Sequence, residues 1–149
     1  MTTLKTEDLE LLWTYEYEGV YVPKDTLQTT LDDLKTFDIR QDDVFLVTFP
    51  KAGTTWTLEM MSAILHDGDI QTLNKTYSWE RGYFLEITLG GHQHRDLPKT
   101  HKVIADLPAS SPRLMKSHLP GQLLPPQVWE KKIKMVYVIR NPKDVLVSF

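Results

Sequence analysis

The chain has 149 residues and contains no cysteine. It therefore has no disulfide framework, no thiolate zinc site and no catalytic thiol, which fits a reducing compartment. It also lacks any apolar run that approaches the length of a membrane span, and its polar N-terminus lacks the apolar region of a secretory leader. We therefore expect a cytoplasmic protein that does not associate with a membrane.

The chain also lacks a large excess of charge of either sign, because the net charge is only −3. This balance argues against a nucleic-acid binder, so any site for an anion must be local. The composition is 41% hydrophobic and 25% charged, which is typical of a globular chain. The length suits one domain with a sizeable core.

Strand-like and helix-like segments alternate along the chain. The expected extended segments are residues 19–23, 43–49, 113–118 and 134–140. The expected helices are residues 26–37, a helix from near Thr54 that ends at residues 67–69, residues 125–129, and a helix that opens at Asn141. Residues 74–102 are expected to form short helical pieces and loop. This alternation predicts an α/β domain with a P-loop-like parallel sheet flanked by helices.

Two of these helices carry more specific expectations. In the helix from Thr54, the side chains of Trp56, Met60, Ala63 and Ile64 fall on one stripe. The last helix has Asn141 as N-cap and Pro at its first position, yet the chain stops at Phe149 after about two turns. We therefore interpret residues 1–149 as a single, incomplete domain.

The most informative motif spans residues 47–56, where a strand leads through Pro-Lys-Ala-Gly into Thr-Thr-Trp at the start of a helix. Such a turn directs backbone N–H groups at an anion, Lys51 adds a full charge, and Thr54 and Thr55 add hydroxyl donors. It is not a Walker A loop, because the lysine precedes the single glycine. No Ser or Thr directly follows the lysine, which is where that pattern places the Mg²⁺ ligand. The alternative is a solvated turn lysine with Trp56 in the core.

Two further motifs end strands at the same expected edge of the sheet. Arg140 ends the strand 134–140, where a guanidinium suits a second phosphate, and Ser148 follows eight residues later. The alternative is a surface arginine paired with an acid and a serine on a helix face. Lys116 and His118 lie in the segment 114–120, and His118 differs from the other four histidines by ending a strand at this edge.

In this order the three motifs resemble those of the cytosolic sulfotransferases, which use 3′-phosphoadenosine 5′-phosphosulfate (PAPS) as sulfuryl donor. The resemblance runs from about Gly19 to Phe149, the N-terminal half of such an enzyme, and so implies truncation before the C-terminal half. The departures are mild and include Ala52 for Ser and Ser117 for Thr.

The resemblance implies a role for each motif residue. His118 is the expected general base, Lys51 is expected to stabilise the leaving oxygen, and Lys116 is expected to lie near the transferring group. The residues implied to bind PAPS are Lys51, Ala52, Gly53, Thr54, Thr55 and Trp56 around the 5′-phosphate and adenine, and Arg140 and Ser148 at the 3′-phosphate. PAPS is the implied co-substrate, and no metal is implied.

The implied acceptor is a small apolar phenol, steroid, alcohol or amine. Tyr21 and Phe84, with Lys116 and His118, are the expected acceptor-binding residues, although the aromatic pair fits an ordinary core equally well. The resemblance allows a homodimer in the full-length protein. Two other classes stay open, a P-loop kinase or NTPase and a non-catalytic nucleotide-binding fragment, and we expect the truncated chain alone to be inactive.

Overall fold

The computed structural model describes residues 13–88, 98–111 and 113–149. The strands are β1 Thr14–Tyr17, β2 Val20–Pro23, β3 Val44–Thr48, β4 Tyr83–Phe84, β5 Leu114–Ser117 and β6 Lys134–Val138. The helices are α2 Gln28–Leu34, α3 Thr54–Leu65, α4 Ile70–Leu73, α5 Ser78–Arg81, α6 Thr100–Ala105, α7 Gln127–Glu130 and α8 Pro142–Ser148, with a 3₁₀ turn at Gly121–Leu123. None of the helices in these ranges is long and apolar enough to cross a membrane.

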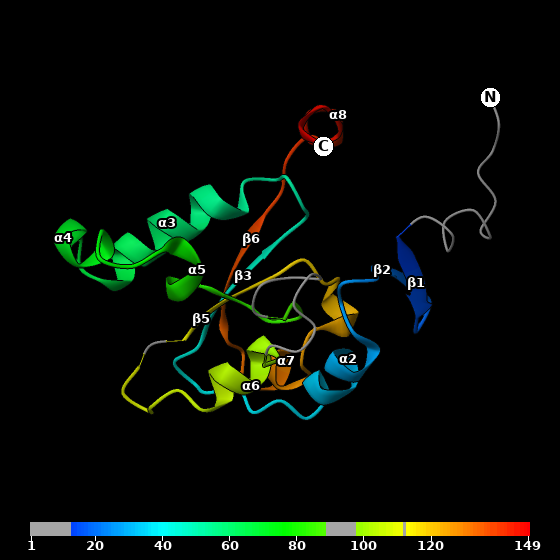
Figure 1. Ribbon diagram of the computed structural model, residues 1–149, viewed down its shortest axis with the longest axis horizontal. Coiled ribbons are helices and arrows are strands. Elements are labelled where there is room, and N and C mark those ends of the chain that lie inside the picture. Colours follow the sequence, from blue (N-terminus) through cyan, green and yellow to red (C-terminus); the bar gives the residue numbers. More distant parts are fainter. Residues whose placement is uncertain (1–12, 89–97, 112) are drawn as a thin grey trace.

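The central sheet has the strand order β4-β5-β3-β6, and every neighbouring pair in it is parallel. Strand β3 lies between β5 and β6, with Val44 opposite both Leu114 and Lys134 (Figure 1). Because all four strands run the same way, the segments that follow β3, β5 and β6 emerge at one edge of the sheet. The predicted α/β fold with a parallel sheet is therefore confirmed.

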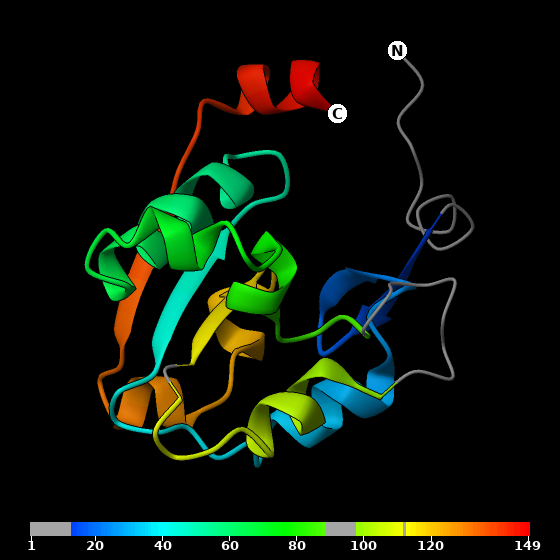
Figure 2. The same ribbon diagram turned by 60° about the vertical axis from the view of Figure 1, so that its left-hand side comes forward.

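The two faces of the sheet are covered by different helices. Phe45 and Val47 of β3 point into a core that also contains buried side chains from α2, α6 and α7. Leu46, which alternates with them, points to the other face and packs with Leu58 and Met61 of α3. Figures 1 and 2 show α3 on one side of the sheet and α2, α6 and α7 on the other.

Helix α3 begins at the predicted residue but does not bury the predicted stripe. Trp56 is 72% exposed, Met60 is 48% exposed and Ile64 is 75% exposed. The helix instead buries Leu58 and Met61, because these side chains face the sheet. The apolar stripe read from the sequence is therefore the outer surface of α3.

The segment ahead of β3 differs from the sequence-based expectation in two ways. Helix α2 is shorter than the predicted 26–37, because Phe37 lies beyond the helix and packs into the larger core. The expected extended piece at residues 19–23 pairs as β2 with an unpredicted antiparallel partner, β1. Within the irregular region 74–102, the described parts contain α5, β4 and α6, and residues 89–97 lie outside the described residues.

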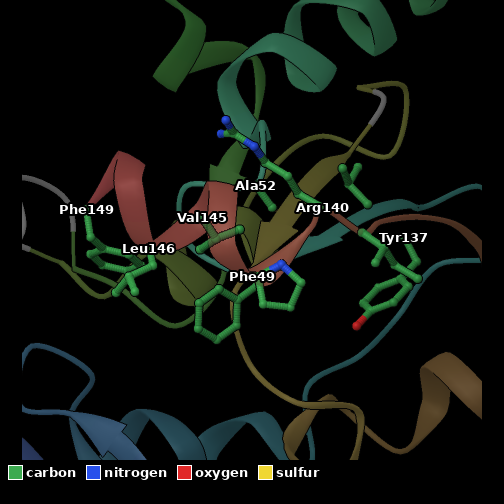
Figure 3. A pocket seen from close by; sticks show the side chains of 10 residues that line it. Phe49, Ala52, Tyr137, Arg140, Val145, Leu146 and Phe149 are labelled. Carbon is green, nitrogen blue, oxygen red and sulfur yellow. The ribbon is translucent and has the colours of Figure 1, made fainter.

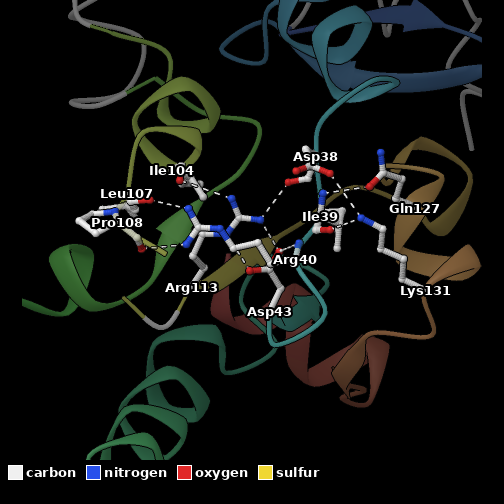
Figure 4. A network of polar contacts seen from close by, with 10 residues as sticks. All are labelled: Asp38, Ile39, Arg40, Asp43, Ile104, Leu107, Pro108, Arg113, Gln127 and Lys131. Atoms are coloured by element: carbon white, nitrogen blue, oxygen red, sulfur yellow. Dashed lines mark hydrogen bonds and ion pairs between the residues drawn. The ribbon is translucent and has the colours of Figure 1, made fainter. Parts of the chain in front are cut away.

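A buried ion pair joins β3 to β5 at the end of the sheet opposite to the segments that follow the strands. Arg113 Nε donates to Asp43 Oδ1 over 2.7 Å, and both residues are buried. Asp43 Oδ2 also accepts the backbone N–H of Arg40 at 2.7 Å. Figure 4 shows this network, which fixes the starting points of the two strands and so supports the register between them.

Candidate functional site

Segments that follow three parallel strands meet in one pocket of ≈ 620 Å³. The loop 49–53 follows β3, His118 follows β5 and Arg140 follows β6. The pocket is lined by Pro50, Lys51, Gly53, Thr54, Thr55, Trp56, Phe84, Lys116, His118, Arg140 and Ser148. Of the residues singled out in the sequence, only Ala52 and Tyr21 are not among them.

The loop between β3 and α3 has an unusual backbone. Lys51 has φ 63° and Gly53 has φ 113°, so a glycine suits the second of these left-handed positions. Gly53 is the N-cap of α3 and no side chain caps the helix. The first-turn N–H groups therefore remain available for an anion.

Ala52 does not take the expected position in the pocket. Its N–H donates to the carbonyl oxygen of Phe49 at 3.1 Å, within the turn. Its side chain is buried on the other side of the loop, where it lines an apolar pocket. The amide that was expected to be a donor for a phosphate is thus used to close the turn.

Thr48, the last residue of β3, connects the start of α3 to His118. The sequence did not lead us to predict this role. Its hydroxyl lies 2.6 Å from that of Thr54 and 3.2 Å from Nδ1 of His118. A polar residue that ends an apolar strand was the available signal. The contact between Thr48 and His118, the residue after β5, is not evident from the sequence, because 70 residues separate the two.

The environment of His118 assigns its protonated nitrogen. Nδ1 lies 2.7 Å from the carbonyl oxygen of Thr48. Because a carbonyl oxygen can only accept, Nδ1 carries the hydrogen and Nε2 of the neutral ring keeps its lone pair. Burial lowers the pKa of His118 and the bond to Thr48 opposes this effect, so the neutral ring is the ordinary form near neutral pH.

Lys116 and Phe84 form the wall beside the histidine. Nζ of Lys116 lies 4.6 Å from the centre of the Phe84 ring, and the His118 ring centre lies 4.9 Å from it. The lysine is 8% exposed, and burial lowers its pKa while the carboxylates of Glu86 and Glu59 oppose that shift. An ammonium group is therefore held against an aromatic face beside the pocket.

Arg140, which follows β6, contacts the loop that follows β3. Its Nη1 donates to the carbonyl oxygen of Lys51 at 2.9 Å. Figure 3 shows the side chain of Arg140 leaving an apolar pocket, with its guanidinium directed toward α3. Ser148 donates its hydroxyl to the carbonyl oxygen of Asp144 at 3.0 Å, so in this structure its donor is used inside α8.

Two apolar pockets flank the polar one. The first, of ≈ 600 Å³, includes His118 and Tyr21 together with Phe49, Trp129 and Tyr137. It contains the expected Tyr21, but Phe84 and Lys116 lie in the polar pocket instead. The second, of ≈ 500 Å³, lies between the loop, β6 and α8 (Figure 3). His118 lines both the polar pocket and the first apolar pocket.

Comparison with known proteins identifies the family of this chain. Residues 41–149 match the family model of the sulfotransferase domain. Sulfotransferase 1A1 of Canis lupus familiaris is 41% identical over 119 residues, which cover 80% of this chain and 38% of that protein. Among solved structures, mouse sulfotransferase SULT7A1 complexed with PAP is 28% identical with a TM-score of 0.65, covering 90% of this chain and 41% of that one. Retinol dehydratase in complex with retinol and PAP is 27% identical with a TM-score of 0.66, covering 86% and 43%.

The chain therefore spans about two fifths of the length of these relatives. The family match nevertheless covers most of the chain, including the loop after β3 and the segments that follow β5 and β6. On this basis the chain belongs to the sulfotransferase family.

Proposed function

We propose that this chain supplies the donor-binding loop and the general base of an enzyme that transfers a sulfuryl group from PAPS to a hydroxyl or amine of a small apolar acceptor. The observation that carries the proposal is the position of His118, which lines both the polar pocket and the first apolar pocket. A base at that boundary reaches an acceptor on one side and a donor on the other. PAP, the product that PAPS leaves after sulfuryl loss, is bound in the two solved relatives named above.

The polar pocket suits a nucleotide with two phosphates. The first turn of α3, without a side-chain cap, and the charge of Lys51 provide for the 5′-phosphate. Arg140 and Ser148, on the other wall of the pocket, provide for the 3′-phosphate. Trp56 is 72% exposed beside the loop and offers a flat surface for adenine.

Ser148 must exchange its present partner to bind a phosphate. Its hydroxyl donates within α8, and a hydroxyl rotates at little cost, so it can turn toward an anion. Thr54 is in the same situation, because its hydroxyl is bonded to Thr48. The backbone and Lys51 are therefore the main anion ligands, and these hydroxyls are auxiliary donors.

The base and the lysines account for the transfer step. Nε2 of His118 takes the proton from the acceptor hydroxyl as that oxygen forms its bond to sulfur. The bond between sulfur and the 5′-phosphate oxygen breaks, and its electron pair remains on that oxygen, beside Lys51. Lys116 lines the same pocket, and in this proposal its charge stabilises the sulfuryl oxygens. As in phosphoryl transfer, positioning and charge stabilisation account for the rate, and a sulfuryl group carries less charge, so we propose no metal.

The first apolar pocket is the proposed acceptor site. The aromatic side chains that line it are those of Tyr21, Phe49, Trp129 and Tyr137. These aromatic side chains suit a flat, apolar molecule whose hydroxyl lies at His118. Phenols and steroids have this shape, and one solved relative holds retinol.

Two measurements test the proposal. The 149-residue chain is titrated with PAP by calorimetry, and we expect binding that His118→Ala leaves intact. Sulfuryl transfer is measured with radiolabelled PAPS and para-nitrophenol in the natural gene product that contains these residues, because we propose that the 149-residue chain alone is inactive. His118→Ala should abolish nearly all transfer there, and His66→Ala, which alters a histidine on the far end of α3, should not.

The outcomes separate the candidate functions. Normal transfer by the His118→Ala variant would exclude the base role. Binding of PAP without transfer in the natural gene product would indicate a non-catalytic nucleotide-binding protein. Mg²⁺-dependent hydrolysis of ATP in place of transfer would favour a kinase or NTPase.

A further inference from the structure

Glu86 is a buried carboxyl group that the proposed reaction does not use. It lies in the bend after β4, next to Leu85, and is 2% exposed. Its Oε1 accepts the backbone N–H of His118 at 2.7 Å. A buried acid of this kind requires an explanation, because an ionised carboxylate is costly to remove from water unless it gains specific partners.

The contact exists because β4 is very short. Phe84 pairs with Lys116, and the N–H of Leu85 donates to the carbonyl oxygen of Lys116 at 3.0 Å. Beyond this point the chain bends away and no backbone acceptor from β4 reaches the N–H of His118. The Glu86 side chain reaches it instead, so a carboxyl group accepts the hydrogen bond where β5 ends.

His118 is therefore held at three points. Glu86 binds its backbone, Thr48 binds Nδ1, and the ring of Phe84 lies against its ring. Phe84 and Glu86 belong to one short segment, residues 84–86. This segment and the end of β3 together set the position of Nε2.

The second oxygen of the carboxyl group is the unusual feature. Oε2 of Glu86 is buried and has no hydrogen-bond partner in the described part of the chain. An unpartnered buried oxygen disfavours the charged form, and protonation at that oxygen removes most of the penalty. Burial accordingly raises the pKa of Glu86 to about 7, against the lowering effect of the His118 N–H.

Within residues 13–88, 98–111 and 113–149, a small set of charged groups acts on Glu86. Lys116 and His118 face it from β5 and the residue that follows, and Asp25 acts on it from the segment before α2. The hydroxyl of Ser117 also favours the carboxylate. In return, the carboxylate of Glu86 raises the pKa of Lys116 and so helps to keep that lysine charged.

From this geometry, and on the basis of the proposed sulfuryl transfer, we propose that Glu86 is a positioning residue whose carboxylate holds the backbone of His118 and loosens that hold when it takes up a proton. A carboxylate accepts an N–H bond more strongly than a neutral carboxyl group does. A base displaced by even 1 Å loses much of its efficiency. Protonation of Glu86 therefore releases His118 and also removes the carboxylate that raises the pKa of Lys116.

A consequence is that two groups control the acid side of the reaction. The ring of His118 takes up a proton at a lower pH than an ordinary histidine does, because burial lowers its pKa. Glu86 is protonated at higher pH, near 7. The activity should therefore fall as the pH drops through about 7, before the ring of His118 is protonated.

The first test is a titration by NMR that needs no turnover. In the ¹⁵N-labelled 149-residue chain, the amide proton of His118 should shift with a midpoint near pH 7. In Glu86→Gln, which keeps an acceptor oxygen in the same place, this midpoint should disappear and only the lower one from the ring should remain. Glu80→Gln is the matched control, because Glu80 also accepts a backbone N–H at 2.7 Å, from Tyr77, but at an exposed site. A midpoint near pH 7 that persists in Glu86→Gln, or is absent from the unaltered chain, would overturn the inference.

The second test measures transfer in the natural gene product. Glu86→Ala should lower kcat by about 10-fold or more with little change in KM for PAPS, and Glu86→Gln, whose neutral acceptor oxygen mimics the protonated carboxyl group, should retain the intermediate kcat that the unaltered enzyme shows below pH 7. The acid limb of kcat in Glu86→Gln should move to lower pH than in the unaltered enzyme. An unchanged limb in an active Glu86→Gln enzyme would overturn the inference and leave the proposed function intact. Absent transfer with an intact amide titration would reject the proposed function and still support the hold of Glu86 on His118.

Discussion

Nδ1 of His118 lies 2.7 Å from the carbonyl oxygen of Thr48, the last residue of β3. The Thr48 hydroxyl lies 2.6 Å from that of Thr54, at the start of the helix that follows the anion loop. The proposed base and the proposed phosphate-binding loop are thus attached to the same residue.

This relationship predicts the tautomer of His118. Near pH 7.5 the ring should be neutral with its hydrogen on Nδ1, because the carbonyl oxygen of Thr48 accepts from that nitrogen. Long-range ¹H–¹⁵N correlation spectra of the histidine-labelled chain measure this directly. His66 is an internal control, because its Nδ1 lies 2.9 Å from the carbonyl oxygen of Ser62 and should show the same tautomer. A hydrogen found on Nε2 of His118 would contradict the proposed role as a base.

Removing the Arg140 side chain should weaken the binding of PAP. Its guanidinium lines the polar pocket and also donates to the carbonyl oxygen of Lys51, so Arg140→Ala removes a charged donor and a support of the loop. We expect a loss of about 1.5–3 kcal/mol in binding free energy, measured by calorimetry. Lys143→Ala is the control, because this lysine lies close by in α8 but does not line the pocket. Equal affinities of the Arg140→Ala variant and the unaltered chain would remove Arg140 from the site.

Breaking the buried ion pair between Asp43 and Arg113 should strongly destabilise the fold. Asp43→Ala leaves the guanidinium of Arg113, whose side chain is 2% exposed, without its carboxylate partner. We expect a loss of about 3–5 kcal/mol in the free energy of unfolding, measured by urea denaturation. The exposed pair of Lys35 and Glu18 is the comparison, and Glu18→Ala should have a far smaller effect. Similar losses in both variants would show that the buried pair is not a special support of the sheet.

Glu86 should make the stability of the chain depend on pH. Its pKa is about 7 in the folded chain, against an ordinary value of 4.5, so the folded state binds the proton more tightly than the unfolded state. The stabilisation from this group is complete below about pH 4.5 and is lost as the pH rises through 7, by up to about 3 kcal/mol. Denaturation at pH 5 and pH 8 should therefore show a fall for the unaltered chain that is largely absent from Glu86→Gln. Parallel changes in the two proteins would mean that Glu86 does not titrate on folding.

Features that depend on a few adjacent residues were predictable from the sequence. The N-cap of α8 is one of them, because Asn141 Oδ1 accepts the N–H of Lys143 at 3.0 Å, as the Asn-Pro pair indicates. The start of α3 at Thr54 is another, since a glycine with positive φ precedes it. The position of Arg140 at the end of β6 follows from strand alternation, and the parallel sheet places it near the loop.

Features that depend on which surfaces meet were not predictable in this way. The stripe of α3 that contains Trp56 is as apolar as the one that contains Leu58, and only the placement of the helix over β3 and β5 decides which is buried. The burial of Glu86 and its contact with His118 were not predicted, because the partner is 32 residues away and the burial results from the bend after β4.

The sequence by itself determined the chemical groups: a basic loop with one glycine, two hydroxyls at a helix start, and a histidine and an arginine that follow strands. Their types and local order follow from short-range rules of turns, caps and alternation. The tertiary structure alone decided their protonation and orientation. The carbonyl oxygen of Thr48 sets the tautomer of His118, and the buried carboxyl group of Glu86 holds the His118 backbone. The physical reason is that hydrogen-bond partners and burial, which set protonation and orientation, come from segments far apart in the chain.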